Sequence, residues 1–193
     1  MSTHCYSLIC LGDSYTIGES VALHAGFPYQ TIQLLRSAGL HFHAPEIIAK
    51  TGWTSFELAD HLIKQQLNES YDFVSLLIGV NNQYRGLDLE SFSEDLSFLI
   101  KKAIHLTGGN SKQVFLMSIP DWTITTFGHS NKKITQQIQL PLSMKFANYC
   151  QQKMAAILLT LQIIPIWRKK IRVYLPKMDC ITVKNLMLIG QRN

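Results

Sequence analysis

The sequence predicts an α/β domain in which helices cover a parallel sheet. Up to about residue 150, short apolar strand-like runs alternate with amphipathic helical segments, the pattern of a parallel sheet with crossover helices. The chain has 193 residues, 47% of them apolar and 16% charged, a composition typical of a globular protein. No internal repeat or low-complexity segment divides it, so we expect one domain over residues 1–193.

Four strands are expected, and a turn signal or a proline ends each of them. The runs cover residues 6–11, 44–49, 73–78 and 114–119. The third run is apolar almost throughout, as expected for a strand that is buried on both faces. Pro120 stops the fourth run, because proline cannot donate to a sheet ladder.

Helices are expected between these strands. The first has apolar positions at Ile32, Leu34, Leu35 and Ala38 and ends at Gly39, a C-cap signal. For the second, Ser55 is the expected N-cap, and its apolar ridge is Phe56, Ala59, Ile63 and Leu67. A third spans residues 89–106 and ends before Gly108-Gly109, and a fourth is expected over 142–158.

The net charge of +5 is concentrated at one end of the chain. Residues 151–193 contain eight of the 18 Lys and Arg residues and one of the 13 Asp and Glu residues, which leaves residues 1–150 with a net charge of −2. No aromatic interleaving or nucleic-acid motif accompanies the run Arg168-Lys169-Lys170. We interpret this run as a solvated face and expect no nucleic-acid partner.

The sequence also argues against a membrane-spanning or disulfide-stabilised protein. No apolar stretch approaches the roughly 20 residues that span a bilayer, and no basic region precedes the first strand as in a secretory signal. The cysteines show neither C-x-x-C spacing nor the density of a disulfide framework; they are Cys5, Cys10, Cys150 and Cys180. We expect reduced thiols in a cytoplasmic protein with no stable membrane insertion.

Three short blocks carry the chemistry, and each lies where an expected strand ends. They are Gly12-Asp13-Ser14-Tyr15, Thr51-Gly52-Trp53-Thr54 and Gly79-Val80-Asn81-Asn82. Because ligands of open α/β sheets bind beyond the carboxyl ends of the strands, the three blocks should share one crevice. A serine hydroxyl, backbone N–H groups and a carboxamide are the groups that acyl transfer needs.

Each block alone is a common turn or cap, but their joint occurrence in this order resembles the SGNH (GDSL) hydrolases. The runs 77–86 and 118–122 are similar to a bacterial lysophospholipase-like branch, and the resemblance covers roughly residues 5–150. It implies a three-layer, flavodoxin-like fold and hydrolysis of a small-molecule ester without a metal or organic cofactor. It also implies that Ser14 is the nucleophile and that the Ser14 and Gly52 N–H groups and the Asn81 amide form the oxyanion hole. Asn82 stands where many relatives have Asp, and Asp13 is interpreted as a local hydrogen-bonding residue rather than the triad acid.

The resemblance fails at the family's fourth block, Asp-x-x-His, which supplies the base that activates the serine. Asp179 is followed by Cys180, Ile181 and Thr182, and no histidine occurs after His129. His129 is interpreted as a surface residue. The remaining histidines have no catalytic spacing; they are His4, His24, His41, His43, His61 and His105. A triad rebuilt from one of these histidines is the alternative to a missing base.

A frame shift near residue 155 accounts for the missing block. The residues from Lys177 to Ile181 require the codons AAR ATG GAY TGY ATH, and two bases later the same bases read RAT GGA YTG YAT. That reading forces Gly-Leu and allows Asp-Gly-Leu-His. We therefore interpret residues 1–154 as family-like and 155–193 as an aberrant tail in which the last strand and helix are disrupted. The alternative is a divergent tail that happens to permit the pattern.

The leading interpretation is an SGNH-type esterase that acts on a small ester or a lysophospholipid and that lacks an evident base as printed. The alternative is a non-catalytic remnant or pseudogene product that binds an ester or glycan at most. A flavodoxin-like nucleotide binder is disfavoured, because the sequence has no Gly-rich phosphate loop. An ester-hydrolysis assay separates the first two interpretations.

Overall fold

The structure is a computed structural model that describes residues 4–117 and 119. Its centre is a four-stranded sheet in the order β2-β1-β3-β4, with every neighbouring pair parallel. The strands are β1 (Leu8–Gly12), β2 (Glu46–Ala49), β3 (Phe73–Leu77) and β4 (Val114–Leu116). This order and direction match a flavodoxin-like sheet, so the predicted fold class is confirmed.

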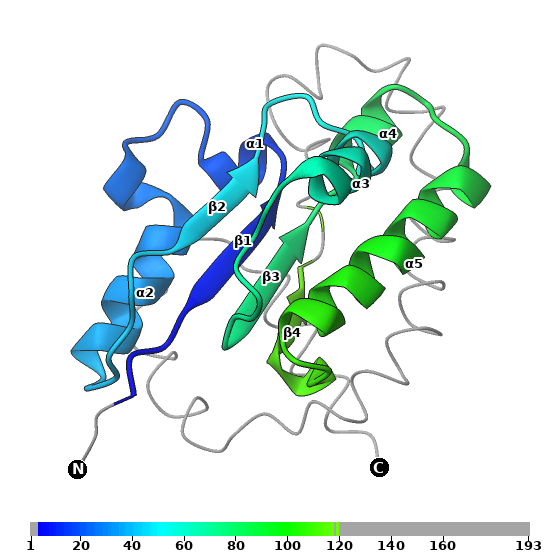
Figure 1. The fold of residues 1–193 in the computed structure, drawn as a ribbon. Coiled ribbons are helices and arrows are strands. Elements are labelled where there is room, and N and C mark those ends of the chain that lie inside the picture. Colours follow the sequence, from blue (N-terminus) through cyan, green and yellow to red (C-terminus); the bar gives the residue numbers. More distant parts are fainter. Residues whose placement is uncertain (1–3, 118, 120–193) are drawn as a thin grey trace, which may run out of the picture.

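Helices cover both faces of the sheet (Figure 1). α2 (Phe27–Ser37) packs on one face, and α3 (Ser55–Lys64) and α5 (Leu89–Leu106) pack on the other. The short elements are α1 (Ser14–Ile17), α4 (Val80–Tyr84) and two 3₁₀ turns, η1 (Leu23–Ala25) and η2 (Ser111–Gln113). Because side chains alternate along a strand, β1 contributes Ile9 and Leu11 to one apolar cluster and Leu8 and Cys10 to the other.

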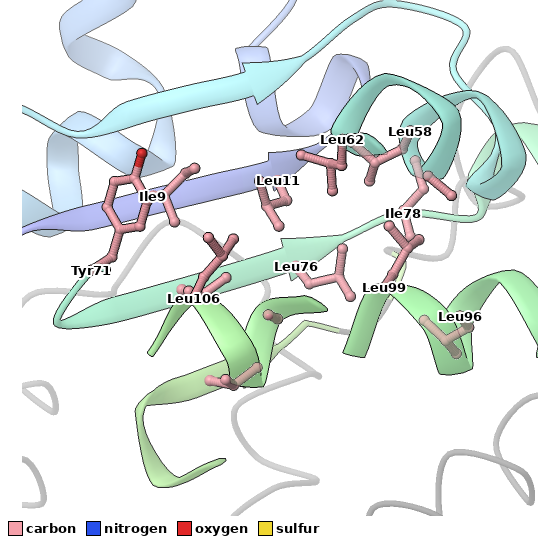
Figure 2. Packing of buried hydrophobic residues seen from close by; sticks show 14 of the residues in the cluster. Ile9, Leu11, Leu58, Leu62, Tyr71, Leu76, Ile78, Leu96, Leu99 and Leu106 are labelled. Atoms are coloured by element: carbon pink, nitrogen blue, oxygen red, sulfur yellow. The ribbon is translucent and has the colours of Figure 1, made fainter. Parts of the chain in front are cut away.

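The larger apolar cluster lies between the sheet and the helices α3 and α5. Figure 2 shows side chains from both helices packed with side chains of β1 and β3; the labelled ones include Leu11, Leu58, Leu62, Leu76, Leu96 and Leu99. Each of these leucines is buried, and full burial of such a side chain contributes about 1.5–3 kcal/mol. The cluster therefore fixes α3 and α5, and with them the loops at the carboxyl edge of the sheet.

The prediction for α5 is confirmed at both ends. Asp88 is the N-cap, and its side chain accepts a hydrogen bond from the Ser91 backbone N–H at 2.9 Å. After the helix, Gly108 and Gly109 adopt positive φ angles of 64° and 88°, a conformation that glycine enters without the steric penalty of a Cβ atom. The two glycines therefore end the helix as expected.

The predicted N-cap of α3 is wrong by one residue. Thr54 is the N-cap, because its side chain accepts from the Glu57 N–H while the Glu57 carboxylate accepts from the Thr54 N–H. This reciprocal pair is a capping box, and its Thr-x-x-Glu spacing is visible in the sequence. Ser55 is instead the first helical residue, is buried, and donates its hydroxyl hydrogen to Asp95 at 2.7 Å.

The predicted apolar ridge of α3 is half right: Ala59 is buried and Leu67 packs against the core cluster, but Phe56 and Ile63 are exposed. Their exposed fractions are 65% and 68%, whereas Leu58 and Leu62 are buried. The sequence has apolar residues at helical spacing on two adjacent faces, so periodicity alone does not choose between them. The Ser55–Asp95 hydrogen bond links the start of α3 to α5 and is consistent with the face that is buried.

The helix expected before Gly39 is present as α2, but two of the four apolar positions that define it in the sequence are exposed. Ile32 and Leu35 are buried, whereas Leu34 is 46% exposed. Ala38 is the C-cap of the helix and is also exposed. Arg36, in the last turn of the helix, donates through its guanidinium to the Phe42 carbonyl and so holds the chain that leaves the helix.

Several predictions concern residues that the structure does not describe. The helix expected over 142–158, the aberrant tail at 155–193, and His129, Asp179, Cys150 and Cys180 lie outside the described residues. Cys5 and Cys10 are free thiols, the first exposed and the second buried. No helix in the described part of the chain is long and apolar enough to cross a membrane.

Candidate active site

The three predicted blocks lie at the carboxyl edge of the sheet. Gly12, the last residue of β1, pairs with Ala49 of β2 and Leu77 of β3, so the three strands end level with one another. Beyond these ends the chain continues into α1, the turn before α3, and α4 (Figure 1). Ser14, Gly52 and Asn81 belong to these three segments. Topology thus brings residues from distant parts of the sequence to one edge.

Ser14 is the first residue of α1, and Asp13 is its N-cap. The Asp13 carboxylate Oδ1 accepts a hydrogen bond from the Tyr15 backbone N–H at 3.0 Å. The first N–H groups of a helix have no acceptor within the helix, and among the described residues none accepts from the Ser14 N–H. No side chain in residues 4–117 or 119 hydrogen-bonds the Ser14 hydroxyl. Within the described part of the chain, both groups therefore lack a hydrogen-bond partner.

Asp13 is almost completely buried, with an exposed fraction of 1%. Its Oδ2 atom has no hydrogen-bond partner among the described residues. Burial raises the pKa of the Asp13 carboxyl to about 6, and the Tyr15 and Gly79 backbone N–H groups oppose the rise. Asp13 thus acts in this structure as the helix cap beside Ser14, with a carboxylate whose charge is poorly compensated.

Gly52 occupies the third position of a β-turn that follows β2. The Trp53 N–H donates to the Lys50 carbonyl at 3.2 Å, and Gly52 has a φ angle of 82°. A positive φ at this position is that of a type II turn, which favours glycine. The Gly52 N–H has no acceptor among the residues described.

Asn81 lies in α4 and contacts the same turn. Its side-chain Nδ2 donates one hydrogen to the Trp53 carbonyl at 2.9 Å. A carboxamide has two N–H donors, and within the described range nothing accepts the second one. The bond to Trp53 fixes the amide plane and leaves one donor available beside the Gly52 turn.

Asn82, the next residue, is buried and makes a different set of contacts. Its Oδ1 accepts from the Ser55 N–H at 2.9 Å, and its Nδ2 donates to the Ser55 hydroxyl at 2.7 Å. Ser55 in turn donates to Asp95 at 2.7 Å. Asn82 therefore links α4 to the start of α3, and the hydrogen bond from Ser55 to Asp95 links α3 to α5.

Sequence reasoning missed Arg85, the C-cap residue of α4. Its guanidinium Nη2 donates to the Gly52 carbonyl at 2.6 Å, and Nη1 lies 3.6 Å from the Glu57 carboxylate. Hydrogen bonds from the Thr54 backbone and hydroxyl, together with the charges of Arg85 and Lys50, lower the pKa of Glu57. Arg85 belongs to the run that resembles the family, but an arginine that binds a backbone carbonyl leaves no pattern of paired side chains in a sequence.

Four of the described histidines lie at the amino edge of the sheet. His4 hydrogen-bonds Asp72 at 2.7 Å before β3, His41 and His43 flank the bridge from Phe42 to Tyr6, and His105 lies in the last turn of α5. β1 has five residues, which separate the two edges by about 16 Å.

The other two described histidines are His24 and His61. His24 is exposed in η1, and the His61 ring packs against the Trp53 ring with centroids 4.8 Å apart. No described histidine hydrogen-bonds Ser14. Within residues 4–117 and 119, no group of three or more His, Cys, Asp or Glu side chains could hold a metal ion.

Fold and site geometry together define an α/β protein with a serine at the carboxyl edge of a parallel sheet. The model of the GDSL-like Lipase/Acylhydrolase family matches residues 10–162. The chain therefore belongs to this family of ester hydrolases. No curated protein sequence matches the chain.

Solved structures agree with the fold. The crystal structure of TesA is similar with a TM-score of 0.52 and 19% identity, over 69% of this chain and 74% of that chain. The crystal structure of AlinE4, an SGNH-hydrolase family esterase, is similar with a TM-score of 0.51 and 11% identity, over 85% of this chain and all of that chain (100%). The predicted family and fold are confirmed, whereas the lysophospholipase-like branch stays a prediction.

Proposed function

We propose that this chain is built to cleave a small ester by nucleophilic acyl transfer, with Ser14 as the nucleophile. The observation that carries the proposal is a set of three unpaired donors at one edge of the sheet. They are the Ser14 N–H, the Gly52 N–H and the second amide hydrogen of Asn81, none of which has an acceptor among the described residues. Donors preorganised in this way stabilise the negative oxygen of a tetrahedral intermediate.

In the proposed reaction, Ser14 Oγ attacks the ester carbonyl carbon and loses its proton to a base. The carbonyl electrons move to the oxygen, which the three N–H donors bind. Collapse of the intermediate expels the alcohol with a proton from the same base, and water then hydrolyses the acyl group from Ser14. Loss of one such donor typically costs about 3–4 kcal/mol of transition-state stabilisation.

The base is the missing part. A serine hydroxyl is a weak nucleophile until a neighbouring group accepts its proton, and the sequence has no histidine after His129. This supports the second candidate, a non-catalytic remnant that binds an ester or glycan at most. We propose that the printed chain retains the oxyanion-binding groups and hydrolyses esters slowly, at most about 10³–10⁴-fold above water.

The test is hydrolysis of p-nitrophenyl acetate by the full chain, with and without added imidazole as an external base. Imidazole alone cleaves this ester, so the rate of the Ser14→Ala variant is subtracted at each imidazole concentration. We expect a Ser14-dependent rate that rises with imidazole. A rate identical in the two proteins would remove Ser14 from the mechanism and favour the non-catalytic interpretation.

A further inference from the structure

We propose that Arg85 is a positioning residue that fixes the Gly52 turn for binding of the substrate oxyanion. The inference rests on the proposed function, because it assigns a role in catalysis to the Gly52 N–H. Its basis is a pair of hydrogen bonds from one helix to successive carbonyls. Arg85 donates to the Gly52 carbonyl at 2.6 Å, and Asn81 donates to the Trp53 carbonyl at 2.9 Å.

Asn81 and Arg85 are four residues apart, in α4 and at its C-cap. Side chains at this spacing lie on the same face of a helix, which is why both reach the one turn. The helix therefore contributes an oxyanion donor through Asn81 and holds the turn of a second donor through Arg85.

The conformation of Gly52 depends on contacts such as the hydrogen bond from Arg85 more than that of another residue would. Glycine has the widest φ/ψ freedom, so the direction of its N–H depends on how the peptides on either side are held. The preceding peptide, Thr51–Gly52, lies in the turn that follows β2 and is closed by the hydrogen bond from the Trp53 N–H to the Lys50 carbonyl. Arg85 binds the carbonyl of the following peptide, Gly52–Trp53. A Cβ atom on Gly52 would lie 3.7 Å from Arg85 Nη2, an ordinary contact, so the guanidinium sits directly against the turn.

The contact between Arg85 and Glu57 is secondary. It measures 3.6 Å, and the two side chains are 46% and 41% exposed; such exposed pairs contribute little. The contact with the Gly52 carbonyl is shorter, at 2.6 Å, and of the two only it lies within hydrogen-bond distance. We therefore expect the removal of Arg85 to change the Gly52 turn more than Glu57.

Arg36 provides a matched control. It also donates through its guanidinium to a backbone carbonyl, that of Phe42, at 3.1 and 2.7 Å. That carbonyl lies beside the bridge to Tyr6 at the amino edge of the sheet, away from the three blocks. Arg36→Ala thus removes the same chemistry from a turn outside the candidate site.

The first measurement follows the Gly52 N–H by NMR in the full chain labelled with ¹⁵N-glycine, with Gly52→Ala used to assign its signal. In Arg85→Ala we expect the order parameter of Gly52 to fall into the flexible range, below about 0.6. Arg36→Ala should leave it unchanged, and Arg85→Lys should restore part of the order. An unchanged Gly52 signal in Arg85→Ala would overturn the proposal whether or not the chain hydrolyses esters.

The second measurement is the Ser14-dependent hydrolysis of p-nitrophenyl acetate with imidazole present. Misplacing one donor should lower kcat roughly 10- to 100-fold with little change in KM, and Arg85→Lys should recover part of the loss. A Gly52 that becomes mobile while kcat is unchanged would overturn the catalytic role. If the unsubstituted chain shows no Ser14-dependent rate, the proposed function fails, and the order parameter of Gly52 alone decides whether Arg85 holds the turn.

Discussion

Asn82 hydrogen-bonds Ser55 through both atoms of its amide: Oδ1 accepts from the backbone N–H at 2.9 Å, and Nδ2 donates to the hydroxyl at 2.7 Å. The Ser55 hydroxyl then donates to Asp95. The hydrogen bonds therefore run in one direction, from the Asn82 amide through the Ser55 hydroxyl to the Asp95 carboxylate. Asparagine at position 82 suits this direction because it is a donor as well as an acceptor.

Asn82→Asp should destabilise the fold by about 2 kcal/mol, because it removes the donor to Ser55 and leaves buried acceptors facing one another. The measurement is the free energy of unfolding in urea. In the double variant Asn82→Asp/Asp95→Asn, the chain of hydrogen bonds can run in reverse, from the new amide at position 95 through the Ser55 hydroxyl to the new carboxylate at position 82. The double variant should therefore recover most of the loss.

Additive effects of the two substitutions would contradict this account. The two residues contact the same hydroxyl, and residues in one hydrogen-bond network normally show a coupling energy of about 0.5–3 kcal/mol. A coupling near zero would mean that Ser55 does not link them in solution.

Much of the fold could be predicted because its strands are short apolar runs that end at turns. β3 is buried along nearly its whole length, and the nearly continuous apolar run from Phe73 to Leu77 predicts such a strand. The site blocks could be placed for the same reason, since parallel strands bring their carboxyl ends to one edge.

The remaining features depend on contacts between distant residues. The buried face of α3 could not be predicted, because Phe56 and Ile63 match a helical period as well as Leu58 and Leu62 do. The Ser55–Asp95 bond, across 40 residues of sequence, leaves no local signal. The Arg85–Gly52 bond also leaves no signal in the sequence, because its acceptor is a backbone carbonyl.

Replacing Asn81 with alanine should impair catalysis more than substrate binding. In a chain corrected by one base near codon 155, we expect Asn81→Ala to lower kcat by about 10²–10³, with a smaller effect on KM. The reason is that the amide binds charge that develops mainly in the transition state. Steady-state kinetics with a short-chain nitrophenyl ester provide the measurement, and a change confined to KM would mean that Asn81 only binds the ground state.

Asp13→Asn should alter how stability depends on pH. The pKa of Asp13 is raised from 3.8 to about 6, so its charged form is disfavoured in the folded state. The contribution of Asp13 to the free energy of unfolding is therefore fully present below pH 3.8 and is lost as pH rises through about 6. Asparagine does not titrate, so the unfolding free energy of Asp13→Asn minus that of the unsubstituted chain should increase as pH rises through this window.

Asp88 provides a control of opposite sign. Hydrogen bonds from the Ser91 backbone and hydroxyl lower the pKa of Asp88, so its contribution is present at neutral pH and is lost as pH falls. The unfolding free energy of Asp88→Asn minus that of the unsubstituted chain should therefore decrease as pH rises from acid to neutral. Parallel curves for the two variants would show that Asp13 is not desolvated as the structure indicates.

The last prediction concerns the aberrant tail at 155–193. We predict that the chain with this tail is poorly soluble and nearly inactive, because residues 151–193 carry eight basic residues, a single acid and no histidine. They therefore lack the Asp-x-x-His block that would supply the base to the serine. A one-base correction near codon 155 should restore solubility and esterase activity, since the corrected frame allows an Asp-Gly-Leu-His block. The two proteins are purified side by side and compared by yield and by turnover of the same nitrophenyl ester. Equal turnover would refute the frame-shift interpretation and point to a base among the existing histidines, and His129 would then be the first to replace.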